Sequence, residues 1–479
     1  MKKMIISLIL ICAIGPMAFA FDNPLLPGVR STNLFGRYST SLYDFSTNPA
    51  FFKISYLDDN LYYYADATGR VNQFRRDYDP KRQQDYTIDF LSIKQISEQV
   101  SMASSIQYDR TYVWDLWRSL EKDFYSEYFS YIDTTTGSTV FTGPQVRFVY
   151  NYAPMERVFL GFDIHYGVEQ GLKDVYTQCE TIARNSEICV GIGYISHDRK
   201  TSIGISGGYQ NAQRKYEAVK EAQDAVVRTY FGYFMTKSEN PRSTNRKNDN
   251  QEGYEINAQI ERQDVFLNGL DLQMLAGWGE KSEFVSIGSV SKPTDLGYCL
   301  RNIRRLTGRF VYLSPDQRVS GHLLVENAHY TDWAETENYN VRFMDSEQVS
   351  NRFEIVGGIR PVKRFSSQIG GTFERISDNY SEYNSDFQYR KDRHNISGFV
   401  ELQAQFNPVL VSRIRTTMSN EEPYFYWNTD KFRTMRITGS VERLFTFGTI
   451  GFDVNFEKIC PDNVTDVNYL FGIAVTYMK

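Results

Sequence analysis

The chain has 479 residues, with 53 basic and 58 acidic side chains and a formal net charge of -5 at pH 7. This balance disfavours nucleic acid as a partner, because Lys and Arg supply much of a protein's affinity for phosphate. After the first twenty residues no run of eighteen apolar residues occurs, which excludes membrane-spanning helices, while the 34 Tyr and 33 Phe suit a protein with aromatic rings at a membrane interface.

The first twenty residues have the organisation of a secretory signal peptide. Lys2 and Lys3 form a positive start, residues 4–14 are largely apolar, and Ala18-Phe19-Ala20 ends in the small-x-small pattern that signal peptidase reads. The apolar run is too short to cross a bilayer, which takes about 20 residues. We therefore expect cleavage near Ala20, which removes both lysines and leaves a net charge of -7.

Residues 21–58 form the next predicted unit. They do not alternate between polar and apolar side chains, and they contain Asn48, Pro49 and Ala50, a run that favours a turn. We expect this segment either to plug the lumen of a barrel or to lead into the barrel from the periplasm.

Residues 59–479 consist of segments whose polarity alternates with a period of two. Val400 and Leu402 lie on one face of such a segment, and Glu401 and Gln403 lie on the other. The apolar face suits lipid and the polar face a wet lumen, so the pattern predicts an all-β fold, a transmembrane antiparallel β-barrel in one domain. The same alternation extends over residues 396–406, 435–442, 450–457 and 469–477.

Short and long connections alternate between the predicted strands. Outer-membrane barrels have short periplasmic turns and long extracellular loops, whereas a secreted β-sandwich or propeller, the soluble alternative, does not need this rhythm. The pattern predicts about 18 strands, within a range of roughly 14–18, with both termini periplasmic. Short turns are expected at 94–97, 153–156, 198–200, 314–317, 361–363, 407–408 and 445–447, and long loops at 111–141, 169–185, 213–252, 279–302, 333–350, 380–393 and 420–431.

Two of these long loops have side chains at helical spacing. In residues 111–131 the rings of Trp114 and Trp117 recur at this spacing, and in residues 212–227 Tyr216 begins a similar stripe. This spacing therefore predicts a helix in each of the two segments. Such helices would form a constriction or a lid, or would simply pack over the barrel mouth.

Four cysteines remain after signal cleavage, and all lie in or beside predicted external loops. In an exported chain four cysteines allow three pairings. One arrangement is a Cys179 to Cys189 disulfide with a second between Cys299 and Cys460, and the other is four free thiols.

Few residues have a spacing suited to catalysis or metal binding. Ser320 and His322 lie two apart on one strand face, as the nucleophile and base of a phospholipase-type barrel do, but in the reverse order. His322 and His329 differ by an odd number and so face opposite ways, which makes them a poor metal pair. We expect no enzyme, no cofactor and no metal.

Charged side chains of both signs occur on the polar face of the last predicted strands. Opposed acidic and basic walls would set a transverse field that filters solutes. Alternatively, the same charges pair across neighbouring strands and stabilise the barrel. These lumen candidates are Glu401, Arg413, Arg415, Arg436, Glu442, Asp453 and Glu457.

Two resemblances to known families add to this interpretation. The run around Asn48-Pro49-Ala50 resembles the turn before the first strand in barrels of the long-chain fatty-acid transporter class, in which an N-terminal hatch sits inside the barrel. Over its whole length the chain is similar to an uncharacterised outer-membrane barrel family of anaerobic Gram-negative bacteria, through Asn23-Pro24-Leu25-Leu26-Pro27-Gly28 and Gly69-Arg70-Val71. That similarity implies the fold and an outer-membrane location, and no particular function.

From the sequence we expect passive transport, which needs no energy source. The segment before the first strand is too short for the plug domain of an energised receptor, so we expect a channel or transporter-like protein for an unidentified solute, apolar or oligomeric. The alternative is a scaffold or docking subunit of a secretion or surface complex. Expected partners are outer-membrane lipid and either that solute or a partner protein.

Overall fold

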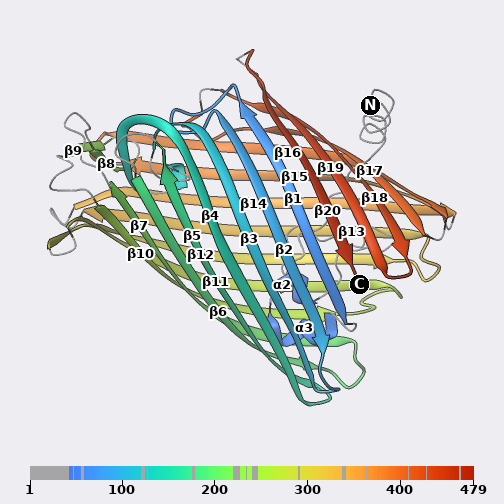
Figure 1. Ribbon diagram of the computed structural model, residues 1–479. Coiled ribbons are helices and arrows are strands. Elements are labelled where there is room, and N and C mark those ends of the chain that lie inside the picture. Colours follow the sequence, from blue (N-terminus) through green and yellow to red (C-terminus); the bar gives the residue numbers. More distant parts are fainter. Residues whose placement is uncertain are drawn as a thin grey trace.

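A computed structural model of the chain describes residues 42–46, 48–55, 59–119, 124–126, 128–174, 179–218, 227–232, 235–239, 246–289, 292–336, 341–362, 364–407, 409–427, 429–462 and 465–479. Eighteen antiparallel strands of these ranges form one closed barrel, in which β1 (Asn60–Asn72) pairs with β20 (Asn468–Met478) to complete the ring (Figure 1). The predicted fold and strand number are confirmed. The predicted signal peptide, residues 1–20, lies outside the described residues.

The barrel strands follow one another in chain order, except that β7 pairs directly with β10. Between these two, β8 and β9 form a separate hairpin whose first strand pairs with the start of β4. The remaining strands are β2 (Arg82–Gln95), β3 (Val100–Ser119), β4 (Phe129–Met155), β5 (Val158–Lys173), β6 (Cys179–Ile195), β7 (Thr201–Ala218), β8 (Val227–Phe231), β9 (Met235–Glu239), β10 (Arg246–Arg262), β11 (Leu270–Ser289), β12 (Lys292–Leu313), β13 (Val319–Thr336), β14 (Val341–Val362), β15 (Phe365–Glu382), β16 (Phe387–Asn407), β17 (Leu410–Glu421), β18 (Phe432–Phe445) and β19 (Gly448–Pro461).

The outer face of the barrel is apolar and exposed. Ile205, Ile256 and Ile369 are 54%, 55% and 65% exposed, whereas the inward Glu401 and Gln403 are only 4% and 3% exposed. Exposed apolar side chains on every side of a closed sheet, over a polar interior, are what a bilayer requires of a spanning barrel. The chain thus has the architecture of an outer-membrane β-barrel. No helix among the described residues is long and apolar enough to cross a membrane.

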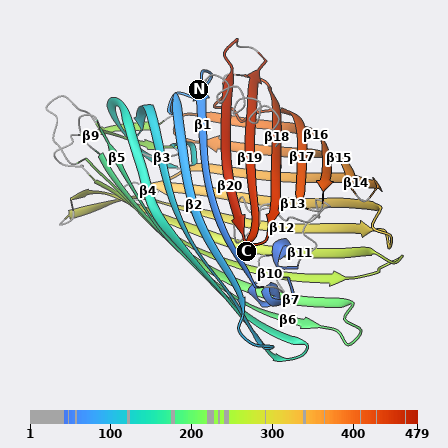
Figure 2. The ribbon, with the colours of Figure 1, turned by 45° about the vertical axis from the view of Figure 1, so that its right-hand side comes forward.

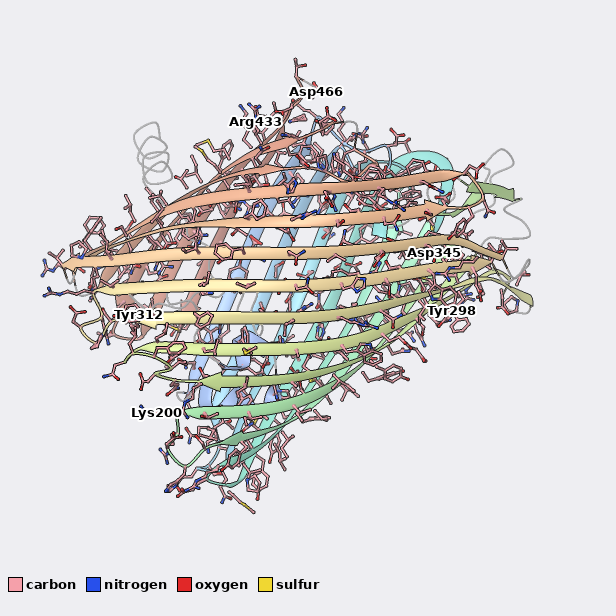
Figure 3. All side chains as sticks on the ribbon, turned by 180° about the vertical axis from the view of Figure 1, so that it is seen from behind. Lys200, Tyr298, Tyr312, Asp345, Arg433 and Asp466 are labelled. Carbon is pink, nitrogen blue, oxygen red and sulfur yellow. The ribbon has the colours of Figure 1, made fainter. Side chains whose placement is uncertain are left out.

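The two ends of the barrel differ. At one end the chain enters and leaves the sheet, where the backbones of Leu61 and Lys479 hydrogen-bond to each other over 3.0 and 2.9 Å. The predicted short turns lie at this end, which we take as periplasmic. Figure 3 shows Lys200 and Tyr312 near it and Tyr298 and Asp345 near the opposite end, where β8 and β9 also lie (Figures 1 and 2).

One periplasmic turn depends on a glycine. Gly269 has a φ of 85°, and a Cβ placed there would meet the Leu313 carbonyl oxygen at 2.1 Å. We expect Gly269→Ala to lower the free energy of unfolding by about 1–3 kcal/mol, because both the backbone and the contact are strained. The free energy of unfolding is measured by urea titration, with the folded fraction read from heat-modifiable migration on a gel. Gly308→Ala is the control, since nothing lies within 4 Å of a Cβ there, and an equal loss in both variants would contradict the expectation.

Neither predicted helix forms over its expected range in the described residues, although one short 3-10 helix, η2 (Phe124–Ser126), lies within the first of them. Residues 111–119 continue β3, with Val113 paired to Thr139, and Tyr216 lies in β7 opposite Lys247. The strands at the external end extend well beyond their predicted bounds. Here both strand faces are apolar: Tyr112 and Trp114 share one face and stack at 5.8 Å, while Val113 on the other face is buried, so the period-two pattern is lost. Residues 219–226 lie outside the described residues.

Candidate functional site in the barrel lumen

Part of the N-terminal segment lies inside the barrel. It consists of α2 (Leu42–Ser46), η1 (Pro49–Phe51) and α3 (Phe52–Ser55), and Figures 1 and 2 show α2 and α3 enclosed by the strands near the periplasmic end. Tyr43, Ala50, Phe51 and Phe52 are completely buried. Ala50 packs against Ala153 and Phe159, close to the turn between β4 and β5. The segment therefore occupies the lumen at its periplasmic end.

Four glycines on the inner faces of β5, β6 and β7 receive this segment, and we call them the glycine cradle: Gly161, Gly191, Gly193 and Gly204. A Cβ at Gly161 would lie 2.0 Å from the Pro49 carbonyl carbon, and one at Gly191 would lie 2.0 Å from Asn48 Oδ1. Cβ atoms at Gly193 and Gly204 would lie 2.7 and 2.4 Å from the Phe51 ring. The segment can pack this closely only because the wall has no side chains here.

Two buried asparagines fix the conformation of the turn. Asn48 caps η1, since its Oδ1 accepts a hydrogen bond from the Ala50 backbone N–H over 3.0 Å. Asn151 of β4 donates from Nδ2 to the carbonyl oxygens of Pro49 and Ala50 over 2.9 and 2.7 Å. The run Asn48-Pro49-Ala50 is thus bonded to the barrel wall as well as packed on it.

Further contacts come from charged side chains of the lumen. The Tyr43 hydroxyl donates to Asp163 over 3.4 Å and accepts from Arg147 over 3.1 Å, and these two charges form an ion pair at 2.6 Å. On a different part of the wall, the Arg309 guanidinium of β12 lies 4.6 Å from the centre of the Phe45 ring. The segment therefore contacts both β4–β7 and β12.

A second occlusion lies at the external end. Residues 128–130, which we call the outer segment, cross the mouth from β4, and Phe129 is completely buried 5.5 Å from Phe343 of β14. The Tyr128 hydroxyl hydrogen-bonds Asp332 and accepts from Arg301 over 3.1 Å, and Arg301 pairs with Asp332 at 2.9 Å. This anchors the outer segment to β12, β13 and β14.

Aromatic loops surround the outer segment. The Arg76 guanidinium, between β1 and β2, lies 3.8 Å from the centre of the Tyr125 ring and 5.1 Å from that of Tyr426. The two tyrosine rings are 4.9 Å apart. Burial raises the pKa of the Tyr125 hydroxyl, which therefore stays neutral. Three external connections thus meet above the lumen.

The charged residues predicted from the last strands lie on the inner faces of β16–β19. Glu401 lies 3.9 Å from both Arg413 and Arg415, and Arg436 pairs with Glu457. Asp453 is buried and Glu442 half-buried on the same face. The described geometry is that of cross-strand ion pairs, which favours the stabilising ladder over the field of opposed walls.

Of the two arrangements left open by the sequence, the structure has the thiols: none of the four described cysteines forms a disulfide. Cys179 and Cys189 lie in one strand, ten residues or about 33 Å apart, far beyond the reach of an S–S bond. Cys299 and Cys460 belong to β12 and β19. We expect alkylation of the unfolded mature chain without reductant to modify four thiols, as counted by mass spectrometry. Labelling that rises only after reduction would contradict this.

Each of the two histidines considered from the sequence lies beside a glutamate. His322 is buried, with its Nδ1 3.7 Å from Glu354 Oε1, and His329 bonds Glu347 over 2.9 Å. In the described ranges no three His, Cys, Asp or Glu side chains are grouped to hold a metal.

The glycine cradle was not predicted from the sequence, because its role depends on the N-terminal segment that it receives, and the sequence does not state where that segment docks. The available signal was Gly191 and Gly193, which share a face with polar Glu187 and not with Ile188, Val190 and Ile192.

No protein-family profile and no curated protein sequence matches the chain. Solved barrels resemble it at low similarity. The ferric preacinetobactin receptor BauA from Acinetobacter baumannii is 7% identical, with 87% of this chain and 80% of that chain covered and a TM-score of 0.40. The ferric citrate transporter FecA is 9% identical, and the match covers 88% of this chain and 79% of that chain, with a TM-score of 0.44. A variant of the monoaromatic hydrocarbon channel TodX is 9% identical, and the match covers 90% of this chain and 93% of that chain, with a TM-score of 0.34. Likeness at this level concerns barrel architecture and indicates no solute.

Proposed function

We propose that this protein is a passive outer-membrane channel whose lumen is occluded by its own N-terminal segment. The observation that carries the proposal is the docking of Asn48, Pro49, Ala50 and Phe51 on the glycine cradle. The wall has glycines at four positions and donates hydrogen bonds to the backbone of the docked turn. Such a wall is suited to hold a plug formed by the chain itself.

The charged lumen supports a water-filled path on either side of the plug. Inward side chains such as Glu255 and Arg305 are exposed although they face the barrel interior. We further propose that the mature chain begins near Phe21, and that the likeness of Asn48-Pro49-Ala50 to the fatty-acid transporter class extends to the occluding role of this turn.

Deletion of residues 42–55 tests the proposal. We expect the mean single-channel conductance in planar bilayers to rise severalfold, because the lumen then lacks its periplasmic occlusion. Heat-modifiable migration on a gel verifies that the shortened barrel is folded. Equal conductance of a folded deletion variant and the full chain would overturn the plug. No conductance from either, together with a co-purifying partner protein, would favour the scaffold.

A further inference from the structure

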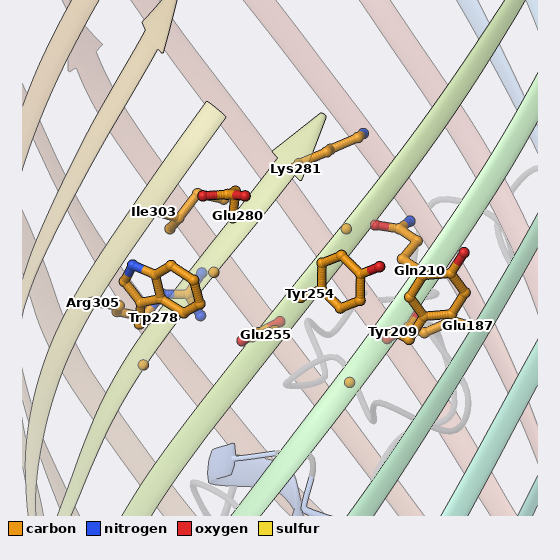
Figure 4. A pocket seen from close by; sticks show the side chains of 14 residues that line it. Glu187, Tyr209, Gln210, Tyr254, Glu255, Trp278, Glu280, Lys281, Ile303 and Arg305 are labelled. Carbon is orange, nitrogen blue, oxygen red and sulfur yellow. The ribbon is translucent and has the colours of Figure 1, made fainter. Parts of the chain in front are cut away.

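A hollow of about 130 Å³ is lined by residues of β6, β7, β10, β11 and β12 (Figure 4). Most of these residues, including Glu187, Gln210 and Glu255, lie on the inner faces of their strands. On β7 the cradle residue Gly204 and the hollow residue Gln210 are six residues apart, and on β10 Lys247, which bonds the outer segment, and Gly253 are also six apart. Six strand residues span about 20 Å. The hollow thus lies about midway between Gly204 of the cradle and Lys247. Arg147, which bonds Tyr43 of the N-terminal segment, lies in the same register row as Glu187, two strands away.

The floor of the hollow consists largely of glycines, which have no side chains. Gly208, Gly253, Gly277 and Gly279 all line it from β7, β10 and β11. Cβ atoms at Gly208 and Gly253 would have no neighbour closer than 3.5 Å, so packing does not require a glycine at either position. The missing side chains leave room beside Gly208 and Gly253, whereas a Cβ at Gly277 would lie 2.5 Å from Asn257 Oδ1.

Among the charged lining residues that face the lumen, acids and bases lie apart; Glu280 also lines the hollow, but it alternates with Gly279 and Lys281 and so belongs to the outer face of β11. Glu187 and Glu255 come from β6 and β10, whereas Lys281 and Arg305 come from β11 and β12. The register places Glu187, Gln210, Gly253 and Lys281 in one row, so the acid and the base at its ends are three strands or about 14 Å apart. Acidic groups therefore line one flank of the glycine floor and basic groups the other.

These flanking charges differ from the buried ladder on β16–β19. Glu255 and Arg305 are exposed to the lumen, whereas Glu401 and Arg413 are each 4% exposed and lie 3.9 Å apart. Glu255 accepts one hydrogen bond, from Asn257 over 2.9 Å, and keeps further acceptor sites. Glu255 and Arg305 are solvated and opposite in sign, so each can bind a complementary group of one solute.

We propose that this hollow is a binding site for small zwitterionic solutes of the amino acid or short-peptide class. The ammonium group lies toward Glu187 and Glu255, and the carboxylate lies toward Lys281 and Arg305. This inference rests on the proposed function, because it treats the hollow as the solute site of the channel. Of the solutes expected from the sequence, apolar or oligomeric, it disfavours an apolar one.

Equilibrium dialysis of the full-length folded barrel against labelled glycylglycine tests the site without requiring conductance, and long equilibration allows slow entry. We expect Glu255→Gln and Arg305→Gln each to weaken binding about tenfold, because each removes one charge-assisted contact. Glu252→Gln and Arg304→Gln are matched controls, since they make the same exchanges on the outer faces of the same strands, and they leave binding unchanged.

A ligand series on the unaltered protein keeps the test decisive if a variant does not fold. Glycinamide lacks the carboxylate and N-acetylglycine lacks the ammonium, so each binds at least about tenfold more weakly than glycylglycine, and glycerol binds more weakly still. Absence of glycylglycine binding, equal binding of all four compounds, or equal losses in lumen and outer-face variants would overturn the site. Binding without any conductance would instead retain the site and overturn the channel.

Discussion

Replacing Gly191 by Leu is expected to release the N-terminal segment from the barrel wall and to raise the conductance. The first side-chain carbon alone would lie 2.0 Å from Asn48 Oδ1, and no real Cβ makes so close a contact. Because Asn48 caps the docked turn, it cannot move aside without giving up its hydrogen bond to Ala50. Overpacking of this kind costs about 1–3 kcal/mol, which changes a ratio of docked to released segment by about 5–150-fold.

Two measurements report on this release. Single-channel conductance rises, and trypsin cleaves after Lys53, which in the docked segment donates a hydrogen bond to the Glu98 carbonyl oxygen. Gly357→Leu makes the same exchange where nothing lies within 4 Å of a Cβ, beside the lipid-facing Ile355, and is expected to change neither quantity. Unchanged conductance and unchanged protection of Lys53 in a folded Gly191→Leu barrel would contradict the role of the cradle.

Much of the fold could be predicted because a bilayer imposes a simple rule on a strand. Side chains such as Val400 and Leu402 must meet lipid while Glu401 and Gln403 meet the lumen, and this alternation is visible without any tertiary information. The rule ends where the strands leave the membrane. The external half of β3 therefore carries Tyr112, Trp114 and Trp117 at a spacing that also fits a helix.

The site could not be predicted in the same way, because it depends on which strands face one another. Asn48-Pro49-Ala50 was recognisable as a turn, but its partner Asn151 lies about a hundred residues away. Likewise, the hollow combines Glu187, Glu255 and Arg305 from three strands whose register the sequence does not state. The lumen residues predicted from the sequence lie instead on the last strands, where the described charges form ion pairs.

Deleting residues 42–55 in a Phe129→Ala barrel is expected to raise conductance by more than the sum of the two single changes. The N-terminal segment and the outer segment lie in series along one lumen, so removing either raises the current while the other still adds resistance. Phe129 is completely buried against Phe343, and loss of a buried Phe side chain typically costs about 3–5 kcal/mol, enough to free the outer segment from its anchor.

A double-mutant cycle measures this coupling, with conductance of the full chain, each single change and the combination. Phe148→Ala is the control, since Phe148 lies on the outer face of β4, where it is 37% exposed. It is expected to leave the conductance unchanged in both backgrounds. Strictly additive increments would mean that the two segments do not limit the same path. Because the hollow lies between them, such a result would also place it beside the conducting route and not within it.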